Sequence, residues 1–526
     1  MMRLLPFLLA VSVLLQSSRS TAPSSEAQSW FQQARQYFEK QQWEESRSAA
    51  MKALEIDPAL ADAEVLLGLA ATAQARLHEA ERHLLRAVSL QPQNDRAQGY
   101  LALVYLQQKR LAEARDAFHK ALKLNPTNQS ASYNLGLIAL MQERPAEALP
   151  HFEKAHQADP SNVAALIGLL ESQLLLKRRD QARLSARKLK ALLKPQDPGF
   201  SQTATLLALN GEYASAIPFM EEVRQIFPQS YDANYNLALA YFRAENPEKA
   251  AQVLRFLVTQ HPRAEAYNLL AAVEERRQDY LEAVRAYQKA AELEPANEDY
   301  RYDYANELLQ HRTNQEAIAL FATGVRDFPN SWKLRLGLGC ARYLAGKFDE
   351  AAQALLETVK IEPGIKLAYF FLGKTYEPAE SFQPAILEAF RAYLERNPDD
   401  PWAYCHYGTI LYLRARLDPQ PDFQPAKSTL NQALALNPAF AEAYLQLGII
   451  LQQEGRFKES VRFLNRAIQS NPKLAPAHYR LAVSYKRLGQ TDRAKAEFDL
   501  NEKFKSESQA EQEKQKMIQF LVEQRK

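Results

Sequence analysis

Residues 441–472 read AEAYLQLGIILQQEGRFKESVRFLNRAIQSNP, and the small residues and the proline of this stretch recur along almost the entire chain. Gly448 is followed twelve residues later by Ser460, and Ser460 is followed twelve residues later by Pro472. The position of Ser460 recurs at steps of 34 residues, except for one step of 33 and one of 41. It is occupied in turn by Ser46, Ala80, Ala114, Ala148, Ala182, Ala216, Ala250, Ala283, Ala317, Ala351, Ala385, Ala426, Ser460 and Ala494. A fixed period of this length indicates an array of stacked repeats, each of which buries its apolar face against its neighbours.

Another small residue lies twelve residues before this position in most of the repeats. It is Ala34, Gly68, Ala102, Gly136, Ala204, Ala238, Ala271, Ala305, Gly339, Gly373, Gly448 or Ala482. Small residues on two facing helices let the helix axes approach to the short end of the usual range of about 8–10 Å. We therefore predict that each repeat is a helix, a turn and a second helix. Below, the earlier residue is called the first-helix small residue and the later one the second-helix small residue.

A proline follows the second-helix small residue by twelve or thirteen residues in every repeat but the last. Proline lacks the backbone N–H and pushes the preceding residue out of the helical region, so it ends the second helix. Glycines such as Gly211, Gly346, Gly455 and Gly489 are expected to reverse the chain between the two helices of a repeat. Fourteen such repeats use nearly all of the 526 residues, so we predict an all-α chain with no separate catalytic domain.

The quoted stretch resembles the tetratricopeptide repeat motif at nearly every signature position. The residues that carry the resemblance are Ala443, Tyr444, Leu445, Leu447, Gly448, Gly455, Phe457, Ser460, Leu464, Ala467 and Pro472. The resemblance covers about residues 27–505 and implies a right-handed α-solenoid of about fourteen repeats with a C-terminal capping helix. Two places depart from it. Leu170 stands where a small residue is expected, and the step of 41 residues adds a proline-rich stretch, 417–423, that we expect to form a protruding loop.

The two ends of the chain differ from the repeats. Arg3, the apolar run from Leu4 to Leu15 and the small residues near Ser20 predict a secretory signal over residues 1–20. The run is too short to span a bilayer, and an uncleaved anchor is the alternative. Residues 21–26 are expected to form a flexible arm, and residues 506–526 a charged helix that caps the array or binds a partner. We therefore expect an exported protein, periplasmic or extracellular, without a transmembrane segment.

Charge and cysteine usage narrow the classes of partner and chemistry. Without Arg3 and Arg19, the 65 basic residues become 63 against 62 acidic residues, which disfavours nucleic acid as a partner. Cys340 and Cys405 lie two repeats apart, about 20 Å at about 10 Å per repeat, so they should not form a disulfide. No residues have the spacing of a metal site, a phosphate loop or a nucleophile elbow. We expect no metal, no cofactor and no enzymatic activity.

In the tetratricopeptide repeat family the first helix of each repeat lines the inner, concave surface, and peptides bind along it. The resemblance therefore implies a partner-binding groove lined by aromatic and polar side chains. We assign to it Tyr133, Asn134, Tyr235, Asn236, Asn268, Tyr302, Asp303, Asn306, Phe370, Phe371, Trp402 and His406. Aromatic rings can bury the side chains of a peptide, and asparagine amides can pair with its backbone. The alternatives are that the aromatic side chains belong to the core between neighbouring first helices and that the asparagines cap local turns.

The fifth repeat also carries a basic stripe. Its residues follow one another at helical spacing: Arg179, Arg183, Arg187, Lys190 and Lys194. Such a stripe suits an acidic partner, an anionic lipid surface or an anionic polysaccharide, and a solvated outer face is the alternative.

We interpret the sequence as that of a non-enzymatic, exported scaffold or adaptor that binds a protein or peptide in its concave groove, in an assembly of the cell envelope. One alternative is a subunit that presents substrates to an enzyme on another chain, such as a glycosyltransferase. The other is a binder of anionic lipid or polysaccharide that uses the basic stripe.

Overall fold

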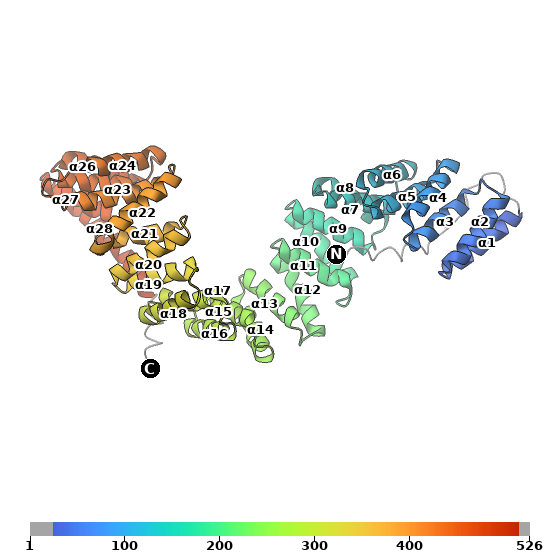
Figure 1. The fold of residues 1–526 in the computed structure, drawn as a ribbon, viewed down its shortest axis with the longest axis horizontal. Helices are drawn as coiled ribbons and strands as arrows, with labels where there is room; N and C mark the ends of the chain where they lie inside the picture. The colour runs from blue at the N-terminus through green and yellow to red at the C-terminus, as the bar shows by residue number, and fades with distance from the viewer. Residues whose placement is uncertain (1–24, 515–526) are drawn as a thin grey trace. The chain divides into compact units, whose positions relative to one another are not determined.

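The computed structural model describes the backbone of residues 25–514 and the side chains of residues 25–507. Over this range the chain forms 28 α-helices and no strand, as the sequence predicted, and it divides into two compact units at Ala244 and Glu245 (Figure 1). The odd-numbered helices are the first helices of the fourteen repeats, and the even-numbered helices are the second helices. Each repeat is therefore a pair of consecutive helices.

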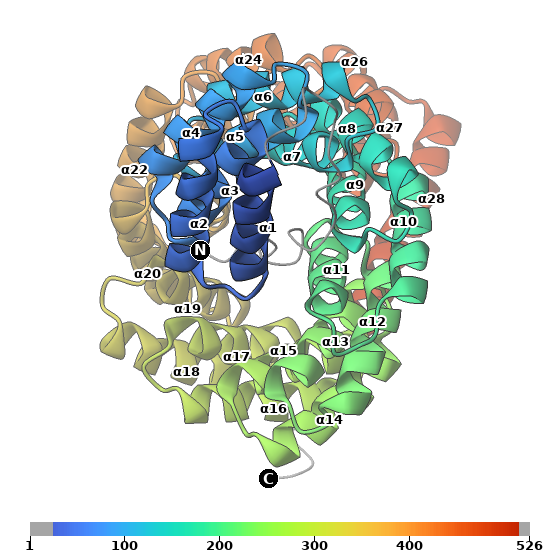
Figure 2. The same cartoon turned by 90° about the vertical axis from the view of Figure 1, so that its right-hand side faces the viewer.

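The N-terminal unit holds α1 (Ser25–Glu39), α2 (Trp43–Ile56), α3 (Ala61–Ala73), α4 (Leu77–Leu90), α5 (Asp95–Gln107), α6 (Leu111–Leu124), α7 (Gln129–Met141), α8 (Pro145–Ala158), α9 (Val163–Leu175), α10 (Arg179–Leu192), α11 (Pro198–Leu209), α12 (Tyr213–Ile226) and α13 (Tyr231–Arg243). In this unit the first helices α3, α5, α7, α9 and α11 lie along the inner side of a curve, and their second helices lie outside them (Figure 2).

The C-terminal unit holds α14 (Pro247–Gln260), α15 (Ala264–Arg276), α16 (Tyr280–Leu293), α17 (Glu298–Gln310), α18 (Asn314–Asp327), α19 (Trp332–Leu344), α20 (Phe348–Ile361), α21 (Lys366–Thr375), the short 3₁₀ helix η2 (Glu380–Phe382), α22 (Gln383–Arg396), α23 (Pro401–Ala415), α24 (Gln424–Leu436), α25 (Ala441–Gln453), α26 (Phe457–Ser470), α27 (Ala475–Arg487) and α28 (Thr491–Lys514).

The small residues bring the two helices of each repeat into close contact. A Cβ atom on Gly136 would lie 2.8 Å from the ring of the fully buried Phe152. The same ring also fills the space beside Gly168 of the next repeat. Where the second-helix small residue is serine, its hydroxyl shows how near the backbones are, because Ser46 Oγ donates to the carbonyl oxygen of Ala34 at 2.9 Å. The predicted role of these positions in close helix packing is confirmed.

The eleventh repeat departs from the predicted register. Ala385 is exposed, and its neighbour Ile386 is completely buried, so Ile386 occupies the place that the sequence assigned to Ala385. The cause is one extra residue in the irregular connection between α21 and α22, which includes η2. The sequence carried a signal of this slip, because Pro398 follows Ala385 by thirteen residues and Ile386 by the usual twelve. A Cβ atom on Gly373 would come no nearer than 3.5 Å to another side chain, so this helix pair is less tightly packed.

Most turns within a repeat contain one residue in the left-handed region. Four of these residues are the glycines that the sequence analysis named, and eight are other residues, for example Ala75 with φ of 59°. Around Ala75 the backbone N–H of Arg76 donates to the carbonyl of Ala71 at 2.8 Å, and that of Ala75 donates to Thr72 at 3.0 Å. These two hydrogen bonds form a Schellman motif, which ends the first helix and reverses the chain.

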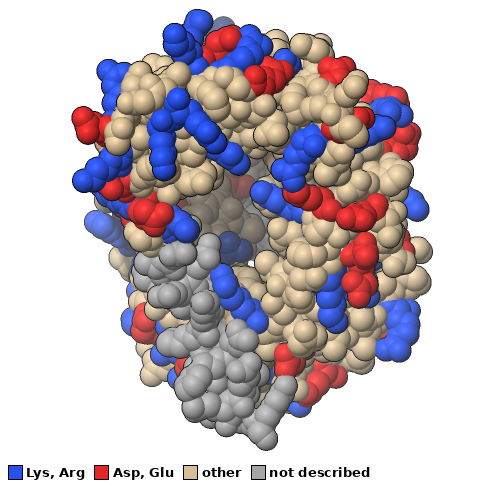
Figure 3. All heavy atoms as spheres, turned by 90° about the vertical axis from the view of Figure 1, so that its left-hand side faces the viewer, with Lys and Arg blue, Asp and Glu red and all other residues tan. Residues whose placement is uncertain are grey.

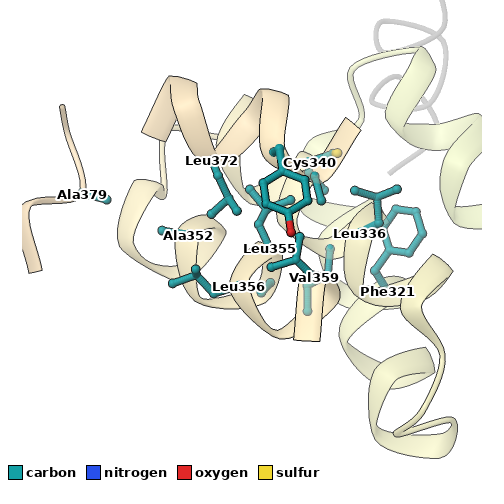
Figure 4. Close-up of a cluster of buried hydrophobic side chains, with 14 of the residues drawn as sticks. Phe321, Leu336, Cys340, Ala352, Leu355, Leu356, Val359, Leu372 and Ala379 are labelled. Carbon is teal, nitrogen blue, oxygen red and sulfur yellow. The ribbon is translucent and has the colours of Figure 1, made fainter. Parts of the chain in front are cut away.

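The largest buried cluster lies in the C-terminal unit and continues across several repeats. Phe321, Leu355 and Leu372 come from α18, α20 and α21 and meet in it (Figure 4). Cys340 belongs to the same cluster, whereas Cys405 lies in the next one, and both thiols are free, as predicted. The core is therefore a row of apolar contacts between neighbouring repeats, as expected of a solenoid.

The irregular stretch in the twelfth repeat is mostly a loop, as expected. Residues 417–422 are exposed, and Leu417 is 70% exposed. The last residue of the predicted loop is different, because Phe423 is buried with its ring centroid 5.6 Å from that of Tyr412. Phe423 therefore packs the end of the loop against the core.

The ends of the chain are described only in part. The predicted signal over residues 1–20 lies outside the described residues, and so does most of the arm predicted over residues 21–26, of which Ser25 and Glu26 already belong to α1. Helix α28 extends to Lys514 and packs on α27, with the rings of Phe504 and His478 5.4 Å apart. Between residues 25 and 514, no helix has the length and apolar character needed to cross a bilayer.

Candidate partner-binding face

Five aromatic side chains from three successive first helices form a continuous cluster in the C-terminal unit. Tyr343 of α19 contacts Phe371 of α21, with ring centroids 5.2 Å apart. Phe371 contacts Phe370 at 5.4 Å, and Phe370 contacts His406 of α23 at 5.8 Å. Trp402 completes the set, 4.2 Å from His406. The structure thus brings together Phe370, Phe371, Trp402 and His406, which the sequence assigned to the groove; we call these four and Tyr343 the aromatic cluster.

Local structure explains how this cluster is held. The side chain of Asp400 caps α23 by accepting a hydrogen bond from the backbone N–H of Trp402 at 3.1 Å. Trp402 and His406 are four residues apart, so they lie on one face of that helix. Phe371 and Trp402 pack partly against the buried core, whereas Phe370 lies beneath the exposed ammonium group of Lys374, 5.6 Å from its ring centroid. One side of the cluster is therefore anchored and the other side is available for contact.

The histidine of the cluster is neutral at neutral pH. Burial lowers the pKa of His406 to about 4, and the neighbouring positive charge of Lys374 acts in the same direction. The carboxylate of Asp400 opposes this shift only in part. His406 consequently contributes an uncharged aromatic ring to the cluster.

A second group of polar side chains lies on α15 and α17 of the same unit. We call Glu275, Asp299, Asp303 and Glu307 the acidic cluster. The side-chain amide of Asn268 donates a hydrogen bond to Asp303, so these two residues, both assigned to the groove, contact each other. Burial raises the pKa of both Asp303 and Glu275, and nearby carboxylates add to the effect.

The hydrogen-bonding groups around the acidic cluster are mostly acceptors. The buried oxygen Oδ1 of Asn268 accepts no hydrogen bond from the described residues, and the half-buried Asn306 has no side-chain hydrogen bond among them. Glu275 has neither a side-chain hydrogen bond nor an ion pair within the described part of the chain. The ammonium group of Lys333 lies 2.7 Å from Asp299, and Nε2 of His311 lies 3.2 Å from Glu307. The site is thus rich in acceptors and poor in donors.

Other predicted groove residues prove to be structural. Tyr133 packs edge-on against the core ring of Phe152 at 5.8 Å, and Tyr302 packs against Phe321 at 5.9 Å. Asn134 is 8% exposed, and its amide donates to the backbone carbonyl of Ser130 at 2.8 Å. Tyr133, Tyr302 and Asn134 therefore make the contacts that the alternative roles as core residues or local caps imply, and their assignment to the groove stays a prediction.

The two remaining groove residues lie on α13 of the N-terminal unit. Tyr235 stacks on Tyr231, with ring centroids 5.7 Å apart. Asn236 is exposed, and its side chain makes no hydrogen bond with the described residues. Asn236 thus has the accessibility that a contact with a partner requires, unlike the equivalent Asn134.

Three of the five residues of the basic stripe form ion pairs with other residues of the chain. Arg179 and Arg183 of α10 both reach the buried carboxylate of Glu212 in the next repeat, at 3.3 and 3.0 Å. Lys190 pairs with Glu222 of α12 at 2.9 Å. Only the remaining stripe residues, Arg187 and Lys194, are exposed without an ion pair among the described residues. On the face of the molecule that Figure 3 draws, which is not the face of this stripe, basic and acidic side chains are interspersed.

The sequence analysis missed two features of the first helices. Tyr343 and the acidic-cluster residues Glu275, Asp299 and Glu307 were not assigned to the groove. Tyr343 and Glu275 share a position, eight residues before Ala351 and Ala283. The second feature is a row of exposed apolar residues on α7, α9 and α11, namely Met141, Leu175 and Leu209, which are 58%, 50% and 79% exposed. Their spacing of 34 residues was the available signal, because each stands seven residues before its second-helix small residue.

Between residues 25 and 507, no group of three or more histidine, cysteine, aspartate or glutamate side chains is arranged to hold a metal ion. What the described inner face offers is aromatic surface, carboxylates and amides. These groups suit the recognition of a peptide or protein surface.

The fold and these faces define an array of stacked helical hairpins suited to protein–protein interaction. Models of the tetratricopeptide repeat match residues 27–60 and 264–297, residues 65–129, 112–163, 302–364 and 345–401, and residues 139–209, 207–273, 420–473 and 451–503. Because these matches cover most of the chain, the protein belongs to the tetratricopeptide repeat family.

One curated relative is the BBSome complex member BBS4 of Bos taurus, which is 24% identical over 270 residues. The match covers 50% of this chain and 49% of that protein, so the chain spans about half the length of this relative.

Among solved structures, Naa15/Naa10 bound to HypK-THB is similar at 18% identity, 90% coverage of this chain and 68% of that chain, with a TM-score of 0.35. Yeast Tom70 is 16% identical, and the match covers 82% of this chain and 96% of that chain with a TM-score of 0.36. PilF of Pseudomonas aeruginosa is 21% identical, and the match covers 42% of this chain and 97% of that chain with a TM-score of 0.35.

Proposed function

We propose that this protein is a non-enzymatic scaffold that binds protein partners along the inner face of its repeats, with the aromatic cluster as a principal contact. The observation that carries the proposal is the contact of five aromatic rings from α19, α21 and α23 at one place. Partly buried aromatic side chains on a rigid helical surface supply much of the binding energy of protein interfaces, because they bury large areas at little cost in conformational entropy.

Membership of a larger assembly fits this function. The relative from Bos taurus is named as a member of a complex, and the repeats of this chain offer contact surfaces on both units. We also propose that the chain is exported and acts in an assembly of the cell envelope. The support for export is the amino-acid pattern of residues 1–20 alone. Fusion of residues 1–26 to a reporter that is active only after export tests it, and a reporter that stays inactive would refute it.

The binding proposal can be tested by site-specific photocrosslinking in the native cell. A photoreactive phenylalanine analogue in place of Phe370 should give covalent adducts with a partner that mass spectrometry identifies. The double variant Tyr343→Ala with Phe370→Ala should lower capture of that partner at least about tenfold, since two hot-spot rings are lost. Phe227→Ala is the matched control, because Phe227 is 52% exposed at the end of the second helix α12.

Two measurements separate loss of binding from loss of folding. The double variant should keep the circular dichroism and the melting behaviour of the unchanged protein, since Phe370 does not belong to the buried core. If the double variant and Phe227→Ala capture the partner equally well, the aromatic cluster is not the contact and the proposal is wrong.

A further inference from the structure

We propose that the acidic cluster and the aromatic cluster are two subsites for one extended peptide, which places a cationic side chain, arginine or lysine, in the first and an aromatic or large apolar side chain in the second. This inference rests on the proposed function, because it specifies which partner chemistry the inner face selects. It is carried by the surplus of unpaired acceptors on α15 and α17 and by the position of these helices next to the aromatic cluster.

Two buried acceptor atoms of the acidic subsite accept no hydrogen bond from the described residues. Glu307 is 1% exposed, and its Oε1 accepts no hydrogen bond, although Nε2 of His311 lies 3.2 Å away. The buried Oδ1 of Asn268 also accepts none. Buried acceptors without donors are rare in folded proteins, because each loses its hydrogen bonds to water without replacement. An arginine or lysine side chain brings several N–H donors into such a place.

The charges around the subsite favour a cation as well. Two carboxylates, those of Glu275 and Asp303, have no cation in direct contact among the described residues. Lys333 is bound to Asp299, and Arg276 is exposed and influences Glu275 only at longer range. The half-burial of Glu275 and Asp303 weakens screening by water, so a bound cationic group interacts more strongly here than with an exposed carboxylate.

The two subsites follow one another on successive first helices. Asp303 of α17 and Phe371 of α21 occupy equivalent positions, two residues before the first-helix small residues Ala305 and Gly373. On the intervening helix α19 this position is Gly337, which has no side chain of its own and lies against the buried ring of Phe321. Two helix spacings of about 10 Å separate the subsites, and an extended chain advances about 3.3 Å per residue. A peptide that fills both should carry its cationic and aromatic residues about six positions apart.

Fluorescence polarisation with synthetic peptides tests this spacing. The probes are fluorescein-labelled peptides of serine, glutamine and alanine that hold one arginine and one tryptophan at separations of two to nine residues, in both orders. The full chain should bind best at a separation of about six. Replacing the arginine by glutamate or the tryptophan by serine in the best peptide should weaken binding at least about tenfold.

A charge-matched pair of protein variants assigns the cation to its subsite. Asp303→Asn with Glu275→Gln should weaken the best peptide about tenfold or more and reduce the salt dependence of its affinity. Asp349→Asn with Glu350→Gln removes the same charge from exposed positions on the second helix α20 and should change neither quantity.

The possible failures are distinguishable. If Tyr343→Ala with Phe370→Ala abolishes peptide binding but the acidic-cluster variant binds the arginine peptide and its glutamate-substituted form as the unchanged protein does, the acidic subsite is refuted while the proposed function stands. If no separation of arginine and tryptophan gives tighter binding than peptides that lack both residues, the two-subsite inference is overturned. If capture of the photocrosslinked partner is also unchanged by Tyr343→Ala with Phe370→Ala, the proposed function is refuted as well.

Discussion

The fourth and fifth repeats, α7–α10, and the eleventh and twelfth, α21–α24, are built from the same pattern but packed differently. In the former pair, Phe152 fits against Gly136 and Gly168, and the turn residues Glu143 and Lys177 have positive φ. In the latter pair, the register slips by one residue, the usual positive-φ turn is missing and additional residues enter the connections. The aromatic cluster lies at this irregular place.

The difference teaches where to look for function in a repeat protein. Regular repeats use their small residues for the packing between helices, and the acidic cluster of the regular eighth and ninth repeats occupies other positions of the first helices. Repeats that break the period accept poorer packing, as the open space beside Gly373 shows, and their side chains are free to form a surface. Four predictions test or sharpen this comparison.

The largest effect is expected from removing a ring of the regular core. Phe152→Ala should lower the free energy of unfolding by about 3–5 kcal/mol, because the side chain is completely buried and a cavity would remain. Phe370→Ala in the irregular repeat should cost less than about 1 kcal/mol, because its ring is only half-buried. Urea unfolding of both variants gives the comparison. Equal losses would mean that Phe370 is a core residue.

The next effect is a pH dependence that belongs to the irregular repeats. The pKa of His406 is about 4 in the folded protein, against 6.5 ordinarily, so below pH 6.5 the unfolded chain binds a proton that the folded protein excludes. Stability from this group is complete above pH 6.5 and falls, by up to about 3 kcal/mol, as the pH drops toward 4. His406→Phe should therefore lose less stability between pH 7 and pH 4.5 than the unchanged protein. Identical pH profiles would contradict the buried, neutral ring.

A smaller effect should reveal the register slip directly. Ala351→Leu places a larger side chain at a completely buried position between two helices and should cost about 1–3 kcal/mol. Ala385→Leu changes an exposed position, so its effect should lie within about 0.5 kcal/mol. Hydrogen exchange of the surrounding amides in the two variants distinguishes them. Strong destabilisation by Ala385→Leu would restore the regular register.

The smallest effects should have opposite signs at two equivalent glycines. Gly136→Ala must displace the buried Phe152 ring and should destabilise the protein by about 1 kcal/mol or more. Gly373→Ala meets its nearest neighbour, Nδ1 of His406, at an ordinary contact distance of 3.5 Å and should stabilise α21 by about 0.5–1 kcal/mol, because alanine favours helix. Melting temperatures of the two variants test the signs. A loss of stability in Gly373→Ala would show that repeat eleven is packed like the others.

The sequence predicted the fold well because the period constrains backbone packing. Thirteen of the fourteen second-helix small residues are buried as expected, and the exception, Ala385, depends on the length of a turn whose conformation no period specifies. The groove was predicted less completely. Asn134 and Asn236 occupy equivalent positions, yet the first bonds Ser130 and the second is free, because the choice depends on the neighbouring side chains. The stripe residues Arg179 and Arg183 were placed correctly on one helix face, but their partner Glu212 lies in another repeat.

The position of Phe152 has a consequence for how the protein opens. Its ring lies against glycines of two consecutive repeats, so the fourth repeat cannot separate from the fifth without exposing the ring on the side that Gly168 covers. In a linear array, the coupling between neighbours determines whether segments fray singly or unfold cooperatively. Helices α8 and α9 should consequently exchange their amide protons as one cooperative block, with a common opening free energy.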